Sequence, residues 1–85
     1  MPYIVTLDNA GRRDLANLEH SISARVSEAI DRLVNEPRPR GCTKIVGTKL
    51  RYRVRAGDYR IIYDVYDQSR SVVVRMIRHR GDAYR

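Results

Sequence analysis

The sequence contains no tryptophan, no phenylalanine and only one cysteine, Cys42. A single cysteine excludes an internal disulfide, and no cluster of Cys and His has the spacing of a zinc site. No apolar run approaches the roughly 18 residues of a membrane span. The N-terminus lacks the charged and apolar regions of a secretory signal, and no glycine-rich phosphate loop is present. We therefore expect a single cytoplasmic domain over residues 1–85 with no metal, no cofactor and no membrane segment.

Acidic residues are scarce in the second part of the chain. Residues 1–37 carry four basic and six acidic side chains, whereas residues 38–85 carry thirteen basic and four acidic ones. Lysine is also scarce, with 2 residues against 15 arginines. Arginine contacts phosphate through two parallel hydrogen bonds and stacks on bases. The net charge of +7 favours a polyanionic partner such as nucleic acid, an acidic protein or an anionic membrane surface.

The first part of the chain predicts one strand and two helices. Residues 3–7 are β-branched and apolar, which is typical of a strand. Asp8 or Asn9 then offers a cap for a short helix over residues 12–18. Apolar side chains at helical spacing predict a second helix over residues 22–33.

The second part of the chain predicts three strands, at residues 51–56, 59–66 and 71–78. A two-residue turn at Gly57-Asp58 joins the first pair, and short turns force an antiparallel meander. We therefore expect an α+β fold of order β-α-α-β-β-β. In it, two N-terminal helices pack on one face of a small twisted antiparallel sheet.

The turn at Gly57-Asp58 also predicts which side chains share a face of the sheet. It pairs Arg55 with Arg60, and alternation then places six side chains on the face away from the helices. We call this the arginine face; it holds Arg51, Arg53, Arg55, Arg60, Ile62 and Asp64. The tyrosines of the hairpin fall on the opposite, core-facing side. Like charges directly opposite each other cost stability, and such departures from local rules tend to mark function.

The same counting across residues 67–70 extends the arginine face to the last strand. It places Arg75 opposite Ile62 and Ile77 opposite Arg60, with His79 on the arginine face and Arg80 off it.

The segment LRYRVRAGDYRIIY (residues 50–63) and the ending IRHRGDAY (residues 77–84) resemble the RelE/ParE superfamily of bacterial and archaeal toxins. The connector NEPRPRG (residues 35–41) and the two predicted helices fit in the same order, so the resemblance covers essentially the whole chain. It implies a RelE-like fold and a ribosome-dependent mRNA endonuclease that cuts in the A site through attack of the 2′-OH and inhibits translation. It also implies a cognate RelB-like antitoxin, with mRNA and the ribosome as further partners.

By position, the resemblance assigns the chemistry to Arg55, Arg60, Arg80 and Tyr84, with Arg53 beside them. RelE-type enzymes often have a lysine near the position of Arg55, and arginine is a poor base. Histidine is the side chain whose ordinary pKa lies nearest neutrality, and His79 is close to these arginines in the predicted sheet. His79 is therefore a candidate general base or acid with Arg55 acting electrostatically, while an ordinary strand-end role for His79 stays open. Other candidates for contact with RNA lie on the last strand, at Arg75 and Arg78, and along the connector and the following loop. The connector and loop cations could equally contact the antitoxin; they are Arg38, Arg40, Lys44 and Lys49.

Two other functions fit the same sequence. A ParE-like toxin would inhibit DNA gyrase without cleaving RNA, although members of that branch generally lack the full set of hairpin arginines, last-strand arginine and terminal tyrosine. A basic module that only binds RNA or an antitoxin would have no chemistry of its own. A hairpin arginine variant separates these readings, because it should abolish cleavage without abolishing binding.

Overall fold

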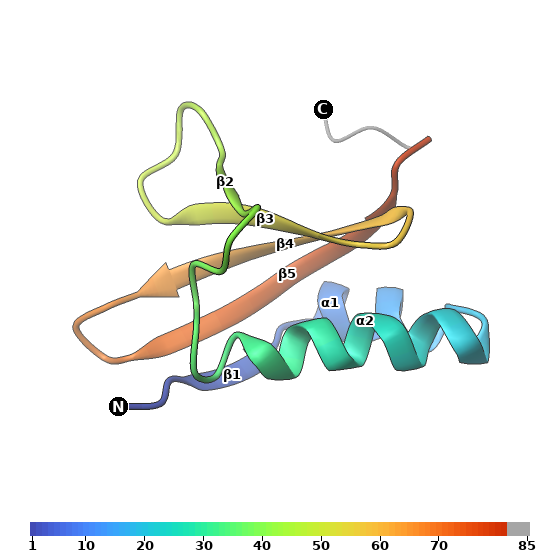
Figure 1. Cartoon of the computed structure of the whole chain (residues 1–85), viewed down its shortest axis with the longest axis horizontal. Coiled ribbons are helices and arrows are strands. Elements are labelled where there is room, and N and C mark those ends of the chain that lie inside the picture. The colour runs from blue at the N-terminus through green and yellow to red at the C-terminus, as the bar shows by residue number, and fades with distance from the viewer. Residues whose placement is uncertain (82–85) are drawn as a thin grey trace.

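The computed structural model describes residues 1–81 and contains the six predicted elements in the predicted order, with one additional short strand. These are β1 (Ile4–Leu7), α1 (Asn9–Ala16), α2 (His20–Arg32), β2 (Thr43–Lys44), β3 (Arg51–Ala56), β4 (Tyr59–Tyr66) and β5 (Ser71–His79). The strands form one sheet of order β1-β5-β4-β3-β2, with both helices on one side of it (Figure 1). The α+β prediction is thus confirmed.

The expectation of a wholly antiparallel sheet is wrong, because β1 pairs with β5 in parallel. Both helices and three strands lie between β1 and β5 in the chain, and a connection of that length allows parallel pairing. A two-residue strand, β2, also extends the sheet beyond β3 and was not predicted. The three-stranded meander from β3 to β5 is antiparallel, as the short turns require.

The core lies between α2 and the inner face of the sheet. The helical stripe buries Val26, Ile30 and Leu33. They pack with buried side chains of the sheet: Ile61, Tyr63, Val65, Val72, Val74 and Ile77. Full burial of one such side chain stabilises the fold by about 1.5–3 kcal/mol. Within residues 1–81 neither helix is long and apolar enough to cross a membrane.

The start of α1 lies directly against β5. Asp8 caps the helix as predicted, and its carboxylate accepts a hydrogen bond from the backbone N–H of Gly11 at 2.8 Å. A Cβ at Gly11 would lie 2.5 Å from the carbonyl oxygen of Val74. Glycine therefore allows the helix to approach the strand this closely.

The register of the β3–β4 hairpin is confirmed. Arg55 pairs with Arg60, and Ala56 with Tyr59, around the two-residue turn. Gly57 has a φ of +62° there, a conformation that glycine adopts without steric cost. The arginine face therefore exists on β3 and β4 as predicted.

The register predicted for β5 is correct only next to the turn. Ser71 pairs with Tyr66 and Val74 with Tyr63, but the register then shifts by one residue. Arg75 is the extra residue of a β-bulge, which reverses the facing of every later side chain. The observed partners beyond the bulge are Ile62↔Met76, Ile61↔Ile77, Arg60↔Arg78 and Tyr59↔His79.

Candidate functional site on the arginine face

Three neighbouring arginines at the centre of the arginine face have no acidic partner among residues 1–81. Arg55 and Arg60 are directly paired across the hairpin, and Arg53 precedes Arg55 by two residues on β3. Within residues 1–81 none of the three makes an ion pair or a side-chain hydrogen bond. Arg55 is exposed, and Arg53 and Arg60 are half-buried. Over residues 1–81, therefore, no carboxylate neutralises these three guanidinium groups.

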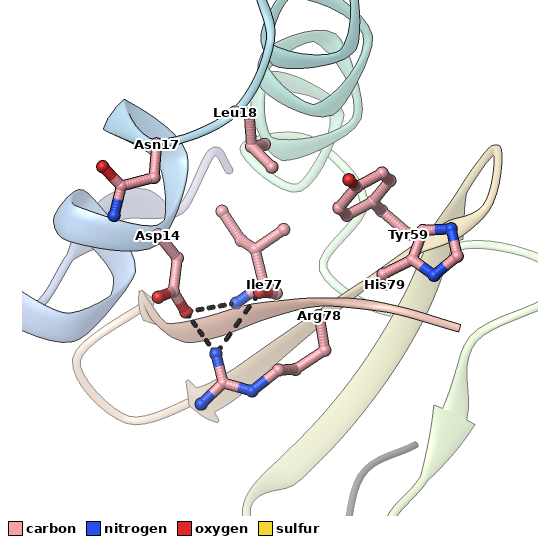
Figure 2. Close-up of a pocket in the computed structure, with 7 residues that line it drawn as sticks. All are labelled: Asp14, Asn17, Leu18, Tyr59, Ile77, Arg78 and His79. Carbon is pink, nitrogen blue, oxygen red and sulfur yellow. Dashed lines mark hydrogen bonds and ion pairs between the residues drawn. The ribbon is translucent and has the colours of Figure 1, made fainter. Parts of the chain in front are cut away.

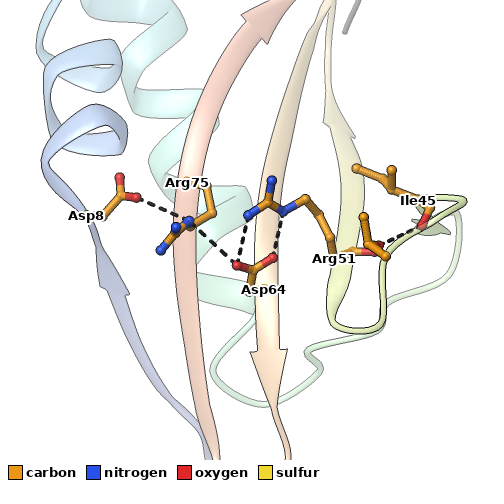
Figure 3. Close-up of polar contacts among 6 residues, drawn as sticks. Asp8, Ile45, Arg51, Asp64 and Arg75 are labelled. Atoms are coloured by element: carbon orange, nitrogen blue, oxygen red, sulfur yellow. Dashed lines mark hydrogen bonds and ion pairs between the residues drawn. The ribbon is translucent and has the colours of Figure 1, made fainter. Parts of the chain in front are cut away.

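The arginines beside this trio are held by carboxylates. Arg51 donates two hydrogen bonds to Asp64, at 2.8 and 3.1 Å, and Asp64 is only 5% exposed. Nε of Arg75 lies 3.6 Å from the same carboxylate and 3.3 Å from that of Asp8 (Figure 3). The ion-pair network Asp8–Arg75–Asp64–Arg51 thus crosses the sheet from the end of β1 to β3. It neutralises the arginines beside the trio and leaves the positive charge concentrated on the trio itself.

The end of β5 adds two further arginines. Arg78 lies opposite Arg60, and its guanidinium reaches Asp14 of α1 at 2.7 Å. Arg80 follows the strand, where its backbone N–H donates to the carbonyl oxygen of Asp58 at 2.8 Å. Its side chain lies 3.8 Å from the Asp58 carboxylate, and both are more than half exposed, so this contact is weak. The predicted site residue Tyr84 lies outside the described residues.

The predicted placement of His79 on the arginine face is wrong. Because of the bulge, His79 lies opposite Tyr59 on the helix side, with ring centroids 5.1 Å apart in an edge-to-face contact. It lines a hollow there with Ile22 and Arg25 of α2. Its Nδ1 accepts a hydrogen bond from the backbone N–H of Gly81 at 3.0 Å. Figure 2 shows His79 beside Tyr59 and turned away from Arg78.

Two other predictions on β5 need the same correction. Met76, not Arg75, lies opposite Ile62, and Arg78, not Ile77, lies opposite Arg60. The prediction that Arg80 lies off the arginine face assumed a regular β5, and the bulge makes that assumption wrong. The described part of the arginine face therefore carries arginines and Asp64 but no histidine.

Arg38 has a structural role in the connector. It donates two hydrogen bonds to Asp67, at 3.1 and 2.7 Å, and one to the hydroxyl of Tyr52 at 3.0 Å. Tyr3 also donates to Asp67, at 2.7 Å. The hydrogen bonds from Arg38 and then Tyr3 lower the pKa of Asp67. Arg38 therefore ties the connector to the β4–β5 turn.

The remaining cations of the connector and loop are less engaged. Lys44 lies over the ring of Tyr52, 6.0 Å from its centroid. Arg40 and Lys49 are exposed, and their side chains make no ion pair with any other residue from 1 to 81. In the same part of the chain, no three His, Cys, Asp or Glu side chains gather as a metal ion would need.

Two residues that matter for this geometry were missed in the sequence. Asp8 was predicted only as a cap, and Asp14 was not singled out. Asp8 is the N-cap of α1 and Asp14 lies in its last turn, and both reach residues of β5 that are more than sixty positions later in the chain. The sequence holds a weak signal for a role of Asp8 and Asp14, since acidic residues are few in this domain. The residues around them in the sequence do not identify their partners on β5.

Comparison with known proteins agrees with the fold. Residues 5–84 match the family described as "ParE toxin of type II toxin-antitoxin system, parDE". Toxin RelG of Mycobacterium tuberculosis is 37% identical over 89 residues, which covers 100% of this chain and 99% of that protein.

Solved structures of complexes contain similar chains. One is the archaeal RelE–RelB complex of Pyrococcus horikoshii, with a TM-score of 0.83 and 33% identity over 98% of this chain and 100% of that one. Another is the toxin–antitoxin complex RelBE2 of Mycobacterium tuberculosis, with a TM-score of 0.83 and 31% identity over 93% of this chain and 99% of that one. With this sequence, this fold and these relatives, the chain belongs to the RelE/ParE family of toxins of type II toxin–antitoxin systems.

Proposed function

We propose that the protein is a ribosome-dependent mRNA endonuclease that acts through its arginine face. The observation that carries this proposal is the trio Arg53, Arg55 and Arg60, which has no acidic partner in the described part of the chain although neighbouring arginines do. A cluster of like charges costs stability. An anionic substrate that uses the three guanidinium groups together gives a reason for retaining them.

RNA cleavage suits a site of this composition. The 2′-OH of the RNA supplies the nucleophile, so the protein needs no covalent group of its own. The transition state is a crowded phosphorane with more negative charge than the ground state. Fixed cations stabilise that charge as it develops. In this proposal Arg55 and Arg60 hold the scissile phosphate through paired hydrogen bonds, and Arg80 stabilises the leaving 5′-oxygen.

The other predicted residues would bind and orient the RNA. Tyr84 would stack on a base or orient the 2′-OH, since aromatic stacking is a common way to hold single-stranded RNA. Exposed cations of the connector and loop, Arg40 and Lys49 among them, would contact phosphates of mRNA or rRNA. His79 is no longer proposed as the base, because it lies on the other side of the sheet.

The ribosome and an antitoxin are the proposed partners. The arginine face is an open sheet surface, which offers few ways to orient a flexible strand, so a ribosome that presents the mRNA would supply the missing order. The solved relatives from Pyrococcus horikoshii and Mycobacterium tuberculosis are complexes with their antitoxins. We propose a RelB-like antitoxin for this chain, which would neutralise it by covering its cationic surface.

Primer extension on an abundant translated mRNA tests the proposal. Wild-type protein, Arg60→Ala and Arg12→Ala are expressed in bacteria; Arg12 is an exposed arginine of α1 and controls for the loss of one charge. We expect cuts within codons for wild type and Arg12→Ala. These cuts should fall by about 100-fold or more in Arg60→Ala and disappear when translation is blocked.

The same experiment separates the alternatives. Growth arrest with intact mRNA would contradict the nuclease proposal and favour gyrase inhibition, the activity expected of a ParE-like toxin. Gyrase supercoiling assays with the purified protein would then decide. Absence of both arrest and cleavage would leave a binding module.

A further inference from the structure

The end of β5 has two possible registers against β4. In the observed one, Ile77 and His79 face the helices while Met76 and Arg78 face the opposite side. A regular strand without the bulge at Arg75 would exchange these pairs and turn Met76 toward the helices. Because Met76 and Ile77 are both apolar, either register places one apolar side chain on the core. Hydrophobic burial therefore does not decide between them.

Helix α1 holds β5 on both sides of the extra residue. Before the bulge, the backbone N–H of Asp8 donates to the carbonyl oxygen of Val74 at 3.1 Å. After it, Oδ2 of Asp14 accepts from the backbone N–H of Ile77 at 2.9 Å and from Arg78 at 2.7 Å (Figure 2). In a regular strand the N–H of Ile77 would point toward β4, because N–H direction alternates along a strand. Asp14 therefore contacts Ile77 in this way only in the bulged register.

The extra residue is itself held in place. The side chain of Arg75 lies between the carboxylates of Asp8 and Asp64, as Figure 3 shows. Asp64 belongs to β4 and is 5% exposed, so it is a fixed point of the sheet. A slipped strand would carry this guanidinium away from one or both carboxylates.

We propose that Asp14 is a positioning residue that selects the bulged register of β5. By this selection it determines that Arg78, and not His79, shares a face with Arg60. The inference rests on the proposed function for its consequence, since the register decides which cations of β5 meet the RNA. It concerns a device within the fold, however, and its primary readout is independent of cleavage.

The test compares Asp14→Ala with a matched control, Asp31→Ala, at an exposed position of α2. Cross-strand nuclear Overhauser effects in the isotope-labelled protein report the register: Arg60 to Arg78 for the bulged strand, and Arg60 to Ile77 for the regular one. We expect the control to resemble wild type. Asp14→Ala should gain the contacts of the regular register and lose about 100-fold in mRNA cleavage.

Deletion of Arg75 is a second way to place Arg78 opposite Arg60. The deletion does not restore the contacts of Asp14, so a recovery in the double variant would come from the strand register alone. Without the extra residue, an unbulged strand again places Arg78 opposite Arg60. Combined with Asp14→Ala, the deletion should therefore restore the Arg60–Arg78 contact and bring cleavage back to within about tenfold of wild type. The deletion alone, which retains Asp14 and keeps the variant testable if Asp14→Ala fails to fold, should keep the same contact.

Three outcomes would overturn the inference. They are an unchanged Arg60–Arg78 contact in folded Asp14→Ala, a double variant that does not recover that contact, and a deletion variant that loses it. Absence of cleavage by the wild-type protein would instead contradict the proposed function and leave the register result standing.

Discussion

Replacing Asp64 by asparagine should strongly destabilise the protein. Asp64 accepts two hydrogen bonds from Arg51, and the exposed fractions of the two side chains are 8% and 24%. Removal of one partner of a buried ion pair costs about 3–5 kcal/mol, because the other charge stays desolvated. Arg51 keeps some exposure and Arg75 keeps Asp8, so we expect the lower end, about 3 kcal/mol. For a domain of this size that lowers the melting temperature by about 12–24 °C.

Urea unfolding followed by far-UV circular dichroism measures this loss without the screening that a charged denaturant would add. Asp31→Asn, at an exposed site, is the matched control and should stay within about 0.5 kcal/mol of wild type. A double variant, Arg51→Leu with Asp64→Leu, removes both charges and should recover most of the loss. An Asp64→Asn protein within about 1 kcal/mol of wild type would refute the reasoning.

Four further outcomes are expected. Gly11→Ala should destabilise the protein by about 1–3 kcal/mol in urea unfolding, because the clash with a β5 carbonyl outweighs the gain of about 1 kcal/mol in helix propensity. Tyr63→Phe should cost about 1–2 kcal/mol in the same assay, since its buried hydroxyl donates to a connector carbonyl at 2.7 Å. Wild type should be more stable than Asp67→Asn, and the difference should reach its full size above the ordinary aspartate pKa of about 3.9. It should disappear as pH falls through the pKa of Asp67, which Arg38 lowers in the folded state; urea midpoints between pH 7 and pH 2 would show this. His79→Gln should cleave mRNA within about threefold of wild type in primer extension, because it lies off the arginine face; a loss of 100-fold would contradict this placement.

The hairpin could be predicted in detail from the sequence because its information is local. Gly57-Asp58 fixes a two-residue turn, and strict alternation from Arg51 to Ala56 leaves one register that buries the tyrosines. The helical stripe on α2 was equally readable, since its period matches a single buried face. Both features depend on residues close together in the chain.

The end of β5 could not be predicted in the same way. Met76 and Ile77 are adjacent and apolar, so the pattern permits a bulge without indicating one. The contacts that fix the bulge come from Asp8 and Asp14, more than sixty residues earlier. The error at His79 followed from counting through this point.

The division of the arginines into paired and unpaired groups also needed the structure. The sequence indicates a face rich in arginine. It does not show that the carboxylate of Asp8 holds Arg75 and that of Asp14 holds Arg78. Those two side chains, predicted as RNA contacts, are therefore partly neutralised within the protein. The trio on the hairpin stands out only once these pairs are known.

The parallel pairing of β1 with β5 has a consequence for how the chain folds during its own synthesis. Ile4 pairs with Ser71, so the first strand has no neighbour in the sheet until the last strand has been made. Helix α1 docks on the same strand, through Gly11 and Asp14. Such distant pairings slow folding and leave apolar surface exposed meanwhile. A chain released before residue 71 would carry the arginine hairpin but would lack β5, the strand with which β1 pairs. Such a chain would be a target for proteolysis rather than a weaker toxin.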